Sequence, residues 1–511
     1  MPTGSAADVQ TRPTPPGPTN RGRWMALIAA LLGWMFDGFE MGMFPLVGQP
    51  ALAELMPNQP AEAISRWFGV IMAVFLVGAA AGGVLFGWLG DRIGRVRAMS
   101  LSIFTYAIFT GLCGFAGEPW HIAVLRFIAS LGMGGEWSLG VALVTELWPD
   151  RSRAVLAGLI GAASNVGFLL VGVISLTMLS LLSYTESALL WVGLGEGTVG
   201  RLLSNQGWRL MMIIGAVPAL LIFFIRLFVP ESARWKQERQ SGATSHWATR
   251  DLLGVLIGTG GALLVVFLWS PLVSHTPVRI LGTLLGVAVA LLGFIYPVMR
   301  YLQRSERAGD SQRSEIGLNM RRLLLGAALT GVALLGTWGA LQWAPRWATQ
   351  LEPDPARHAK EYTQICSSLG AIVGTFAAAI LGGWIGRRIT FVLLCVGAYG
   401  SALLLYNANA SFGPAFLASV MLAGALTASF YGWFPLYLPE LFPTKVRATS
   451  QGFAFNFGRI IAAIGTLQTP TLIIFFDGSF PKAGSALSLI YIAGIFLIWL
   501  GPETKGKPLP A

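Results

Sequence analysis

Charged residues are scarce in this chain. Only 12% of its 511 residues are Asp, Glu, Lys or Arg, while 54% are hydrophobic. A soluble domain carries about 25% charged residues, so most of this surface is unsuited to water. The composition excludes an ordinary soluble protein and predicts one that is largely surrounded by lipid.

Cysteine and histidine are also rare. The three cysteines, Cys113, Cys366 and Cys395, lie far apart in or beside apolar runs, and there are four histidines, at loops or span ends. This spacing excludes a disulfide framework and a zinc pattern. The sequence offers no nucleophile–base pair, metal cluster or nucleotide-binding loop, so we expect neither enzyme activity nor a cofactor.

The net charge is +11, yet no continuous basic patch produces it. The basic residues fall between apolar runs, as they do in the cytosolic loops of membrane proteins. We therefore expect a lipid bilayer, and no nucleic acid, as a partner. Residues 1–23, rich in Pro and Thr, are predicted to be a disordered cytosolic tail. No signal-peptide pattern precedes Trp24, so the first span is expected to stay as an anchor.

Long apolar runs dominate the rest of the chain. A helix needs about 20 such residues to cross the hydrocarbon of a bilayer. Fourteen segments qualify: 24–47, 67–90, 98–117, 121–147, 154–182, 208–229, 252–273, 279–299, 321–345, 362–384, 388–407, 413–438, 448–476 and 484–501.

The chain also contains an internal repeat. TELWPDRSRA at 145–154 matches PELFPTKVRA at 439–448, with an offset of 294 residues and no gap. The repeat predicts two six-helix bundles, 24–229 and 321–501, because repeated membrane bundles build a transport site at their interface. The remaining pair of spans, 252–299, is expected to be a hairpin inserted in the linker 230–320. The alternative is two peripheral surface helices.

Loop charge predicts the orientation. Basic clusters precede the first span and follow spans 2, 4, 6, 8 and 12, and Lys505 and Lys507 lie in the tail 502–511. With fourteen spans these loops share one side, so we expect both termini in the cytosol of a multi-pass inner or plasma membrane protein.

Several motifs occur in the order typical of one family. The loop after span 2 reads GWLGDRIGR, from Gly87 to Arg95, and GWIGRRI at 383–389 is a weaker echo in which Arg387 takes the Asp position. PESARW at 230–235 and PETKG at 502–506 follow the last span of each bundle. Over residues 24–506 the chain resembles the major facilitator superfamily. The resemblance implies a monomeric all-α transporter that alternates access between two six-helix bundles.

A narrower resemblance comes from two spans. DGFE at 37–40 and GMGGEW at 132–137 are similar to motifs of organic-acid/proton symporters, which include aromatic-acid, lactate and sialic-acid carriers. The sialic-acid group shares the central extra hairpin. The resemblance implies import of a small organic anion driven by the proton gradient. Glu40 stands where the family often has Asp, which leaves the fit of the substrate open.

The candidate proton-coupling residues are Asp37, Glu40, Arg126 and Glu136. Asp37 and Glu40 share a helix face, and Asp37 lies about 20 Å into its span. An ionised carboxylate there costs roughly 3 kcal/mol, and residues kept at that cost are usually functional. Arg126 is at a depth to pair with either acid, for coupling or as a static ion pair. Glu136 is either a second titrating group or a contact where helices approach closely.

Arg459 is the strongest candidate for substrate binding. It lies about 16 Å into span 13, and the repeat maps it to Asn165. A guanidinium near mid-membrane can bind a substrate carboxylate, or form a structural pair with an acid such as Glu136. Gln451 and Asn456 are candidates for hydrogen bonds to the substrate, or for helix–helix contacts.

Polar and aromatic side chains in two further spans complete the candidates. Trp338 and Gln342 open the second bundle, and Tyr431 lies in its fourth span. Aromatic residues in membrane bundles also serve as packing or interface anchors. A cytosolic gate of charged residues is predicted at the span ends, with these members: Asp91, Arg92, Arg95, Glu146, Arg153, Glu231, Arg234, Glu440 and Arg447.

The sequence thus predicts a proton-coupled transporter of a small organic anion such as sialic acid, lactate or another carboxylate. The alternative transport function is a sugar or polyol carrier, which would not need a carboxylate-binding arginine. A transporter-like nutrient sensor would add a long cytosolic domain, whereas the longest loops here are short.

Overall fold

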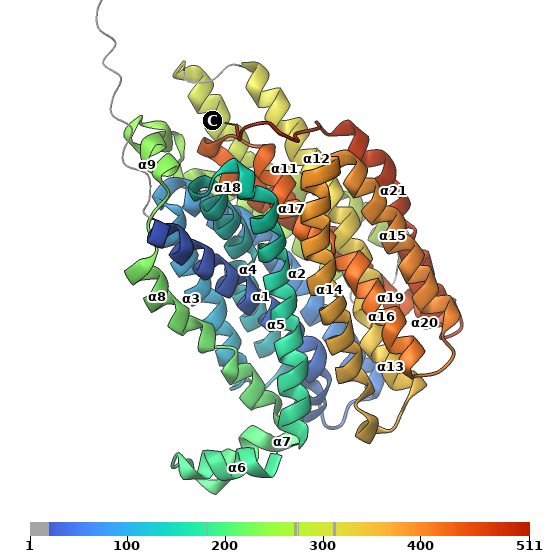
Figure 1. Cartoon of the computed structure of the whole chain (residues 1–511). Coiled ribbons are helices and arrows are strands. Elements are labelled where there is room, and N and C mark those ends of the chain that lie inside the picture. The colour runs from blue at the N-terminus through green and yellow to red at the C-terminus, as the bar shows by residue number, and fades with distance from the viewer. Residues whose placement is uncertain (1–19, 181, 270–272, 274, 310–312, 511) are drawn as a thin grey trace, which may run out of the picture.

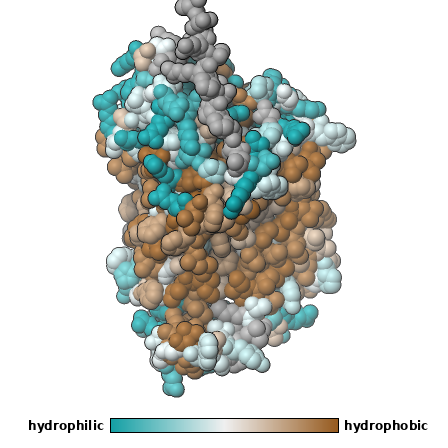
Figure 2. All heavy atoms as spheres, turned by 60° about the vertical axis from the view of Figure 1, so that its left-hand side comes forward, coloured by the Kyte–Doolittle hydropathy of each residue, from teal (hydrophilic) through white to brown (hydrophobic). Residues whose placement is uncertain are grey.

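The computed structural model describes residues 20–180, 182–269, 273, 275–309 and 313–510. Residues 1–19 of the predicted tail, 1–23, lie outside the described residues. The described part is helical without a strand, and 13 of its helices are long and apolar enough to cross a membrane. Figure 2 shows an apolar belt between two polar ends. The prediction of an all-α polytopic membrane protein is confirmed.

The first bundle holds the helices up to residue 228 (Figure 1). Their bounds are α1 (Asn20–Leu55), α2 (Ala61–Ile93), α3 (Arg95–Cys113), α4 (Pro119–Leu147), α5 (Arg153–Ser180), α6 (Leu182–Trp191), α7 (Glu196–Ile214) and α8 (Leu221–Phe228).

The helices of the second bundle are interrupted more often than those of the first. Its helices are α12 (Arg313–Leu335), α13 (Ala344–Leu351), α14 (Ala359–Ile385), α15 (Arg387–Ala408), α16 (Pro414–Ala428), α17 (Phe430–Tyr437), α18 (Arg447–Asn456), α19 (Gly458–Phe475), α20 (Phe480–Ser488) and α21 (Ile490–Leu497). A π-helical turn, Gly336–Ala340, and a 3₁₀ turn, Leu341–Trp343, join α12 to α13. The predicted span 448–476 is divided between α18 and α19 at Phe457.

The linker between the bundles forms α9 (Ala233–Gln240), α10 (Leu252–Leu268) and α11 (Thr276–Arg307). A side chain on Gly254 would meet Gly293, and one on Gly261 would meet Gly286, so α10 and α11 are closely packed and antiparallel. This pair packs against α2 of the first bundle and against α12, α18 and α19 of the second. It therefore lies along the line where the two bundles meet.

The molecule has two distinct ends. On the terminal face, the start of α1 meets the end of α4, where the Trp148 indole donates to the backbone oxygen of Arg23 at 3.3 Å. The C-terminal segment lies on this face too, because Arg447 at the start of α18 donates to the oxygen of Pro510 at 2.7 Å. The opposite end, which carries α6 and α7, is the far face (Figure 1).

Glycine allows the helices that enclose the centre to approach closely. A Cβ on Gly38 of α1 would stand 1.9 Å from the backbone oxygen of Ser164 on α5. A Cβ on Gly458 of α19 would stand 2.6 Å from the backbone nitrogen of Gly331 on α12. Side chains at these crossings would push the helices apart, so the repeat builds the same close contact in each bundle.

Candidate functional site

A cavity of about 80 Å³ lies between the bundles. Trp34 and Met41 of α1 and Asn165 of α5 line it from the first bundle. The second bundle contributes most of the wall, from α12 through α14, from α16 and α17, and from Phe455 and Arg459. The cavity is thus enclosed by the two repeats together, as the duplication predicts.

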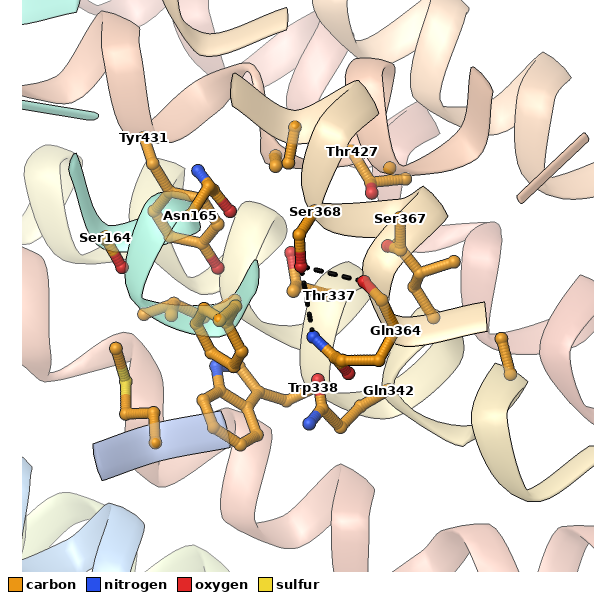
Figure 3. A pocket seen from close by; sticks show the side chains of 18 of the residues that line it. Ser164, Asn165, Thr337, Trp338, Gln342, Gln364, Ser367, Ser368, Thr427 and Tyr431 are labelled. Carbon is orange, nitrogen blue, oxygen red and sulfur yellow. Dashed lines mark hydrogen bonds between the residues drawn. The ribbon is translucent and has the colours of Figure 1, made fainter. Parts of the chain in front are cut away.

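Five of the predicted substrate-binding residues line this cavity: Asn165, Trp338, Gln342, Tyr431 and Arg459. Figure 3 shows Asn165 beside Tyr431, with Trp338 and Gln342 on a neighbouring wall. The irregular turns at 336–343 position Trp338 and Gln342, because they replace the regular helix where α12 reaches the cavity. Such turns within a helix are frequent at functional sites.

Gln451 and Asn456 are not among the cavity-lining residues, contrary to the prediction. The Asn456 amide nitrogen donates to the Gly134 oxygen of α4 at 2.8 Å and to the Gly452 oxygen at 3.0 Å. It also fills the space beside Gly83 of α2. Asn456 lies on the side of α18 that faces α2 and α4, so its side chain connects these three helices. Gln451 is fully buried on the same helix.

The sequence analysis missed the polar wall formed by α14. The Gln364 amide nitrogen donates to the Ser368 hydroxyl at 3.2 Å, and that hydroxyl donates to the Gln364 backbone oxygen at 2.8 Å (Figure 3). Ser164, Thr337 and Thr427 add further hydroxyl groups to the cavity wall. The available signal was Gln364 and Ser368 at a spacing of four in an apolar span, which places both on one helix face.

Arg459 is the only charged residue among the described residues that line the cavity. Its side chain is 1% exposed and lies over the Phe455 ring, with its Cζ 5.7 Å from the ring centroid. One terminal nitrogen donates to the Met133 sulfur at 3.2 Å, and Nε has no hydrogen-bond partner in the described part of the chain. No acid within the described ranges lies at ion-pair distance from it. The predicted alternative, a pair with Glu136, is not formed.

The predicted pair of Glu40 and Arg126 is present. An Arg126 terminal nitrogen stands 2.6 Å from Glu40 Oε1, and both side chains are almost fully buried. The Thr110 hydroxyl donates to the same Glu40 oxygen at 3.1 Å. The guanidinium also lies over the rings of Phe44 and Phe75, at 5.1 and 4.4 Å. Glu40 Oε1 is therefore bound by a cation and a hydroxyl, while Oε2 has no hydrogen-bond partner among the described residues.

Asp37 is in a different environment. It is fully buried, and neither of its oxygens has a hydrogen-bond donor in the part of the chain that the structure describes. Its electrostatic neighbours are Glu136, Arg459 and Glu40, and Glu136 is the strongest of these. Tyr106, which the sequence analysis did not single out, lies beside Glu136. Two neighbouring buried carboxyls cannot both carry a charge at low energetic cost.

Glu136 packs into a notch that Gly33 leaves in α1, where a Cβ would stand 1.6 Å from Glu136 Oε1. Next to it, the Trp137 ring stacks on Phe455, with centroids 3.8 Å apart. Phe455 thus contacts the acid-bearing helix α4 on one side and Arg459 on the other. The acids and the cavity arginine are linked through a packed aromatic layer.

Two buried glutamates join the bundles at the terminal face. Glu146 Oε1 pairs with Arg95 at 3.1 Å and with Arg447 of the second bundle at 3.2 Å. Glu440 Oε1 pairs with Arg387 at 2.6 Å and with Arg153 of the first bundle at 2.6 Å. Each glutamate therefore receives one arginine from each bundle.

The terminal face holds a third connection between the bundles. Asp91 at the end of α2 accepts hydrogen bonds from the backbone nitrogen and hydroxyl of Thr449, at 2.8 and 2.6 Å. It also accepts from the Ala448 backbone nitrogen at 3.3 Å and pairs with Arg95 at 3.1 Å. A carboxylate at the start of a helix interacts favourably with the positive end of the helix dipole. Asp91 thereby holds α2 against the start of α18.

The structure corrects the repeat alignment that placed Arg387 at the position of Asp91. Arg95 donates to the Gly90 oxygen, five residues before it, at 2.9 Å, and Arg387 donates in the same way to Gly382 at 2.9 Å. Arg387 therefore corresponds to Arg95, and the position of Asp91 is taken by Gly383. The sequence match had aligned the second motif four residues away, because the letters GWxG occur in both copies.

Glu231 and Glu503 hold the linker and the C-terminal segment in equivalent places. Glu231 accepts from the Arg95 backbone nitrogen at 2.9 Å, and Glu503 from the Arg387 nitrogen at 2.9 Å. Burial raises the pKa of Glu231. Partial burial also raises the pKa of Glu503. Hydrogen bonds from backbone N–H groups, mainly that of Arg387, outweigh this effect and lower the pKa of Glu503 below its ordinary value.

Two predicted gate residues lie outside this network. Arg92 donates to the Thr249 hydroxyl at 2.8 Å and lies over the Trp88 ring at 4.9 Å. Arg234 forms no ion pair with any described residue. Arg234 lies near enough to Arg447 for their charges to interact, but it does not pair with a buried glutamate in the described part of the chain. Ser232 and Thr504, which donate to Glu146 and Glu440, are members that the sequence did not reveal.

Comparison with known sequences covers most of the chain. The family model described as "Sugar (and other) transporter" matches residues 25–253 and 319–511. The interval that it leaves out contains most of the hairpin formed by α10 and α11.

Three curated relatives align over most of their own length. A putative metabolite transport protein of Haemophilus influenzae is 28% identical over 95% of this chain and 98% of its own. A probable 4-methylmuconolactone transporter of Cupriavidus pinatubonensis is 27% identical over 94% and 90%. The sialic acid transporter NanX of Escherichia coli is 23% identical over 94% of both chains.

A solved structure confirms the architecture. The proton:xylose symporter XylE, of the major facilitator superfamily, superposes with a TM-score of 0.64 at 20% identity, over 96% of this chain and 98% of that protein. At 20% identity this likeness establishes the fold alone. The ligand has to be inferred from the residues that line the cavity.

Proposed function

The chain belongs to the Sugar (and other) transporter family and has the major facilitator fold, and on that premise we propose that it imports a small organic anion together with protons by alternating access. Transport, as opposed to an enzyme reaction, follows from the family. The anionic substrate and the proton coupling are the parts that we propose.

The observation that carries the proposal is the state of Arg459. A buried guanidinium costs several kcal/mol unless an anion or enough hydrogen-bond acceptors compensate it. Here the direct contacts of the guanidinium in the described chain are a thioether and an aromatic ring, while Asp37 and Glu40 interact with it electrostatically without forming an ion pair. A substrate carboxylate could accept two hydrogen bonds from the planar guanidinium, which is the geometry that favours arginine at such sites.

The cavity favours a compact, flat acid. Arg459 is the charged member of its described lining, and most of the other large side chains there are aromatic. A ring that carries a carboxylate matches this combination of side chains. Trp34, Phe168, Trp338, Tyr431 and Phe455 supply aromatic faces for stacking. Muconolactone and sialic acid, named for two relatives, both carry a carboxylate.

Proton coupling is proposed to use the acids behind the cavity. Protonation of Asp37 or Glu136 removes the repulsion between their carboxyls, and Arg459 is a cation that interacts electrostatically with Asp37. A substrate anion that occupies Arg459 would weaken its attraction for the carboxylate of Asp37 and favour protonation there. Binding of the anion and of the proton would then support each other.

The terminal-face network is proposed to be the inner gate. It joins the bundles through Asp91, Glu146 and Glu440, so the described state is closed on that face. Basic loops on the same side favour a cytosolic location for both termini. We place the protein in the cell membrane as a monomer, with the proton gradient in place of a cofactor.

A sugar or polyol is the second candidate substrate. The amides of Asn165, Gln342 and Gln364 and the hydroxyl of Ser368 could bind sugar hydroxyls. This candidate is also favoured by the fold that the chain shares with a xylose symporter.

A binding titration tests the choice. Purified protein is titrated with benzoate, nicotinate, sialic acid and xylose, and Arg459→Gln and Arg459→Lys are compared with the parent. We expect Arg459→Gln to weaken acid binding by roughly 2–4 kcal/mol, and Arg459→Lys to retain part of the affinity, since it keeps the charge and loses the fork. Gln451→Leu, outside the cavity, serves as the control. Tight acid binding by Arg459→Gln, or binding of xylose alone by the parent, would overturn the proposal.

A further inference from the structure

A second, larger cavity of about 920 Å³ lies on the flank of the molecule, and we call it the flank pocket. The start of α2 forms one wall, and α13, the end of α19 and the start of α20 form another. Trp269 and Arg279, at the far-face end of the hairpin, close it. The central transport mechanism does not use this pocket, although it touches both bundles and the insertion.

The flank pocket is positively charged. Its described lining contains Arg66, Arg279 and Arg346, and a single acid, Glu62. Glu62 is paired with Arg66 at 2.5 Å. Arg279 and Arg346 form no ion pair within the described ranges, which leaves two guanidiniums facing one space. Such a concentration of unpaired positive charge attracts an anion, and guanidinium binds phosphate particularly well.

Two buried donor nitrogens in the wall of the flank pocket have no acceptor among the described residues. Arg279 Nε and Gln468 Nε2 have no hydrogen-bond acceptor in the described part of the chain, although both side chains line the flank pocket. A buried donor without a partner costs about 1–3 kcal/mol, so a ligand that accepts these hydrogen bonds would recover that energy. Together with the charge, these donors indicate a site for an oxyanion.

The surroundings indicate the source of that oxyanion. The outer surfaces of α10 and α11 expose large apolar side chains, with Leu256, Leu281 and Leu292 more than 60% exposed, as expected for contact with acyl chains. Trp269 and Trp343 line the pocket, and each carries an arginine over its ring, Arg279 at 5.4 Å and Arg346 at 5.7 Å. Tryptophan is enriched where the bilayer meets water.

We propose that the flank pocket binds the phosphate headgroup of an anionic phospholipid from the leaflet at the far face. The phosphate would accept hydrogen bonds from Arg279, Arg346 and Gln468, and the acyl chains would follow the apolar surface of the hairpin. Since α2 belongs to one bundle and α13 and α19 to the other, the bound lipid ties the bundles together at the far face. The inserted hairpin thereby completes a lipid site that the two repeats lack on their own.

The test uses the purified full-length chain in a neutral detergent. Dioctanoyl phosphatidylglycerol is titrated while the unfolding temperature is measured, with dioctanoyl phosphatidylcholine and inorganic phosphate as separate arms. We expect a saturable increase with phosphatidylglycerol and little change in the other two arms. In the double variant Arg279→Gln/Arg346→Gln the half-saturating concentration should rise by about tenfold or more, as loss of charged hydrogen bonds predicts.

Arg300→Gln is the matched control, because Arg300 lies on α11 outside the flank pocket and should keep the parent response. If the double variant does not fold, Arg346→Gln alone is used, since this exposed side chain contributes little to packing. An equal response to phosphatidylcholine, or an unchanged response of the variants, would overturn the site. Saturation by inorganic phosphate at the same concentration would overturn the lipid assignment.

Discussion

At the scale of the residue, Asp37 and Glu40 show how position decides function. Both lie on α1, one turn apart, and both are buried. Glu40 has Arg126 at 2.6 Å and the Thr110 hydroxyl at 3.1 Å, whereas Asp37 has no donor among the described residues. A nearby fixed cation favours the charged form of an acid, while an acid beside a second carboxyl is suited to exchange its proton. We therefore assign the proton-carrying role to Asp37 and a positioning role to Glu40.

Substitutions at these two residues should have different effects. Asp37→Asn removes the titrating group and keeps the shape, so we expect normal protein levels, substrate exchange close to that of the parent, and loss of proton-driven accumulation. Glu40→Gln leaves Arg126 without its anion, and breaking such a buried pair costs about 3–5 kcal/mol, so we expect a large loss of stability.

Reconstituted vesicles provide the measurement, with exchange and accumulation of the same labelled acid recorded for each variant. Glu62→Gln, on the same bundle but outside the acid cluster, is the control. Accumulation by Asp37→Asn at the level of the parent would remove Asp37 from the coupling mechanism.

The sequence was sufficient for some of these residues. A charge in a long apolar run is conspicuous, so depth in the spans singled out Asp37, Glu40, Arg126 and Arg459 as buried charges, while the family resemblance suggested a coupling role for the first three. Neutral polar residues give no such signal: Gln364 lines the cavity while Asn456 joins helices, and both are amides in helical segments. Only the rotation of each helix about its axis distinguishes them, and rotation depends on packing.

At the scale of the element, the main feature around the cavity is the interruption of its helices. The turns at 336–343, 429 and 457 interrupt second-bundle helices around the cavity. The sequence predicted each of these segments as a continuous span, because hydropathy measures length in lipid and is blind to a local change of helix type. The breaks beside the cavity lie in the bundle that supplies most of its wall. In the first bundle the predicted span 208–229 is also divided, between α7 and α8.

The contact between α2 and α18 offers a test of the inner gate. Asp91→Asn weakens the cap on the start of α18, and loss of a favourable charge at a helix start costs up to about 2 kcal/mol. We expect the terminal face to open more often and transport per molecule to fall, with protein levels unchanged. Thiol labelling at Ser367→Cys, on the cavity wall, from the terminal side should become faster.

Arg92→Gln is the matched control for this variant. Arg92 is adjacent to Asp91 but interacts with Thr249 and Trp88, outside the ion pairs between the bundles. Equal labelling rates in Asp91→Asn, Arg92→Gln and the parent would show that the cap does not hold the gate closed.

At the scale of the whole molecule, the two-bundle architecture follows from the sequence repeat. The copies at 145–154 and 439–448 occupy equivalent positions at the terminal face. Glu146 and Glu440 each bind one arginine from the first bundle and one from the second. The sequence did not reveal the correct alignment of Arg387, because the repeated GWxG letters are shifted by one helical turn relative to the equivalent backbone.

The fourteen predicted spans lead to a topology test. Trp269 and Arg279, at the far-face ends of α10 and α11, line the same pocket as α13, and α11 ends at Arg307 toward the terminal face. Reporters inserted at His275 and after Arg307 should therefore read as extracytoplasmic and cytosolic, respectively. A reporter after Lys507 should agree with the one after Arg307. The same location for His275 and Arg307 would contradict the hairpin.

The central claim is tested most directly by proton-driven uptake of an aromatic acid. The protein is reconstituted into vesicles, and accumulation of labelled nicotinate is followed after an inward proton gradient is imposed. Protein-free vesicles correct for passive entry of the neutral acid. A pH gradient equivalent to about 100 mV supplies about 2.3 kcal/mol per proton, roughly fiftyfold accumulation of an anion that enters with one proton. We predict accumulation that collapses with a protonophore and is absent in Arg459→Gln. Gradient-driven accumulation of xylose, with no uptake of acid beyond that of protein-free vesicles, would contradict the account.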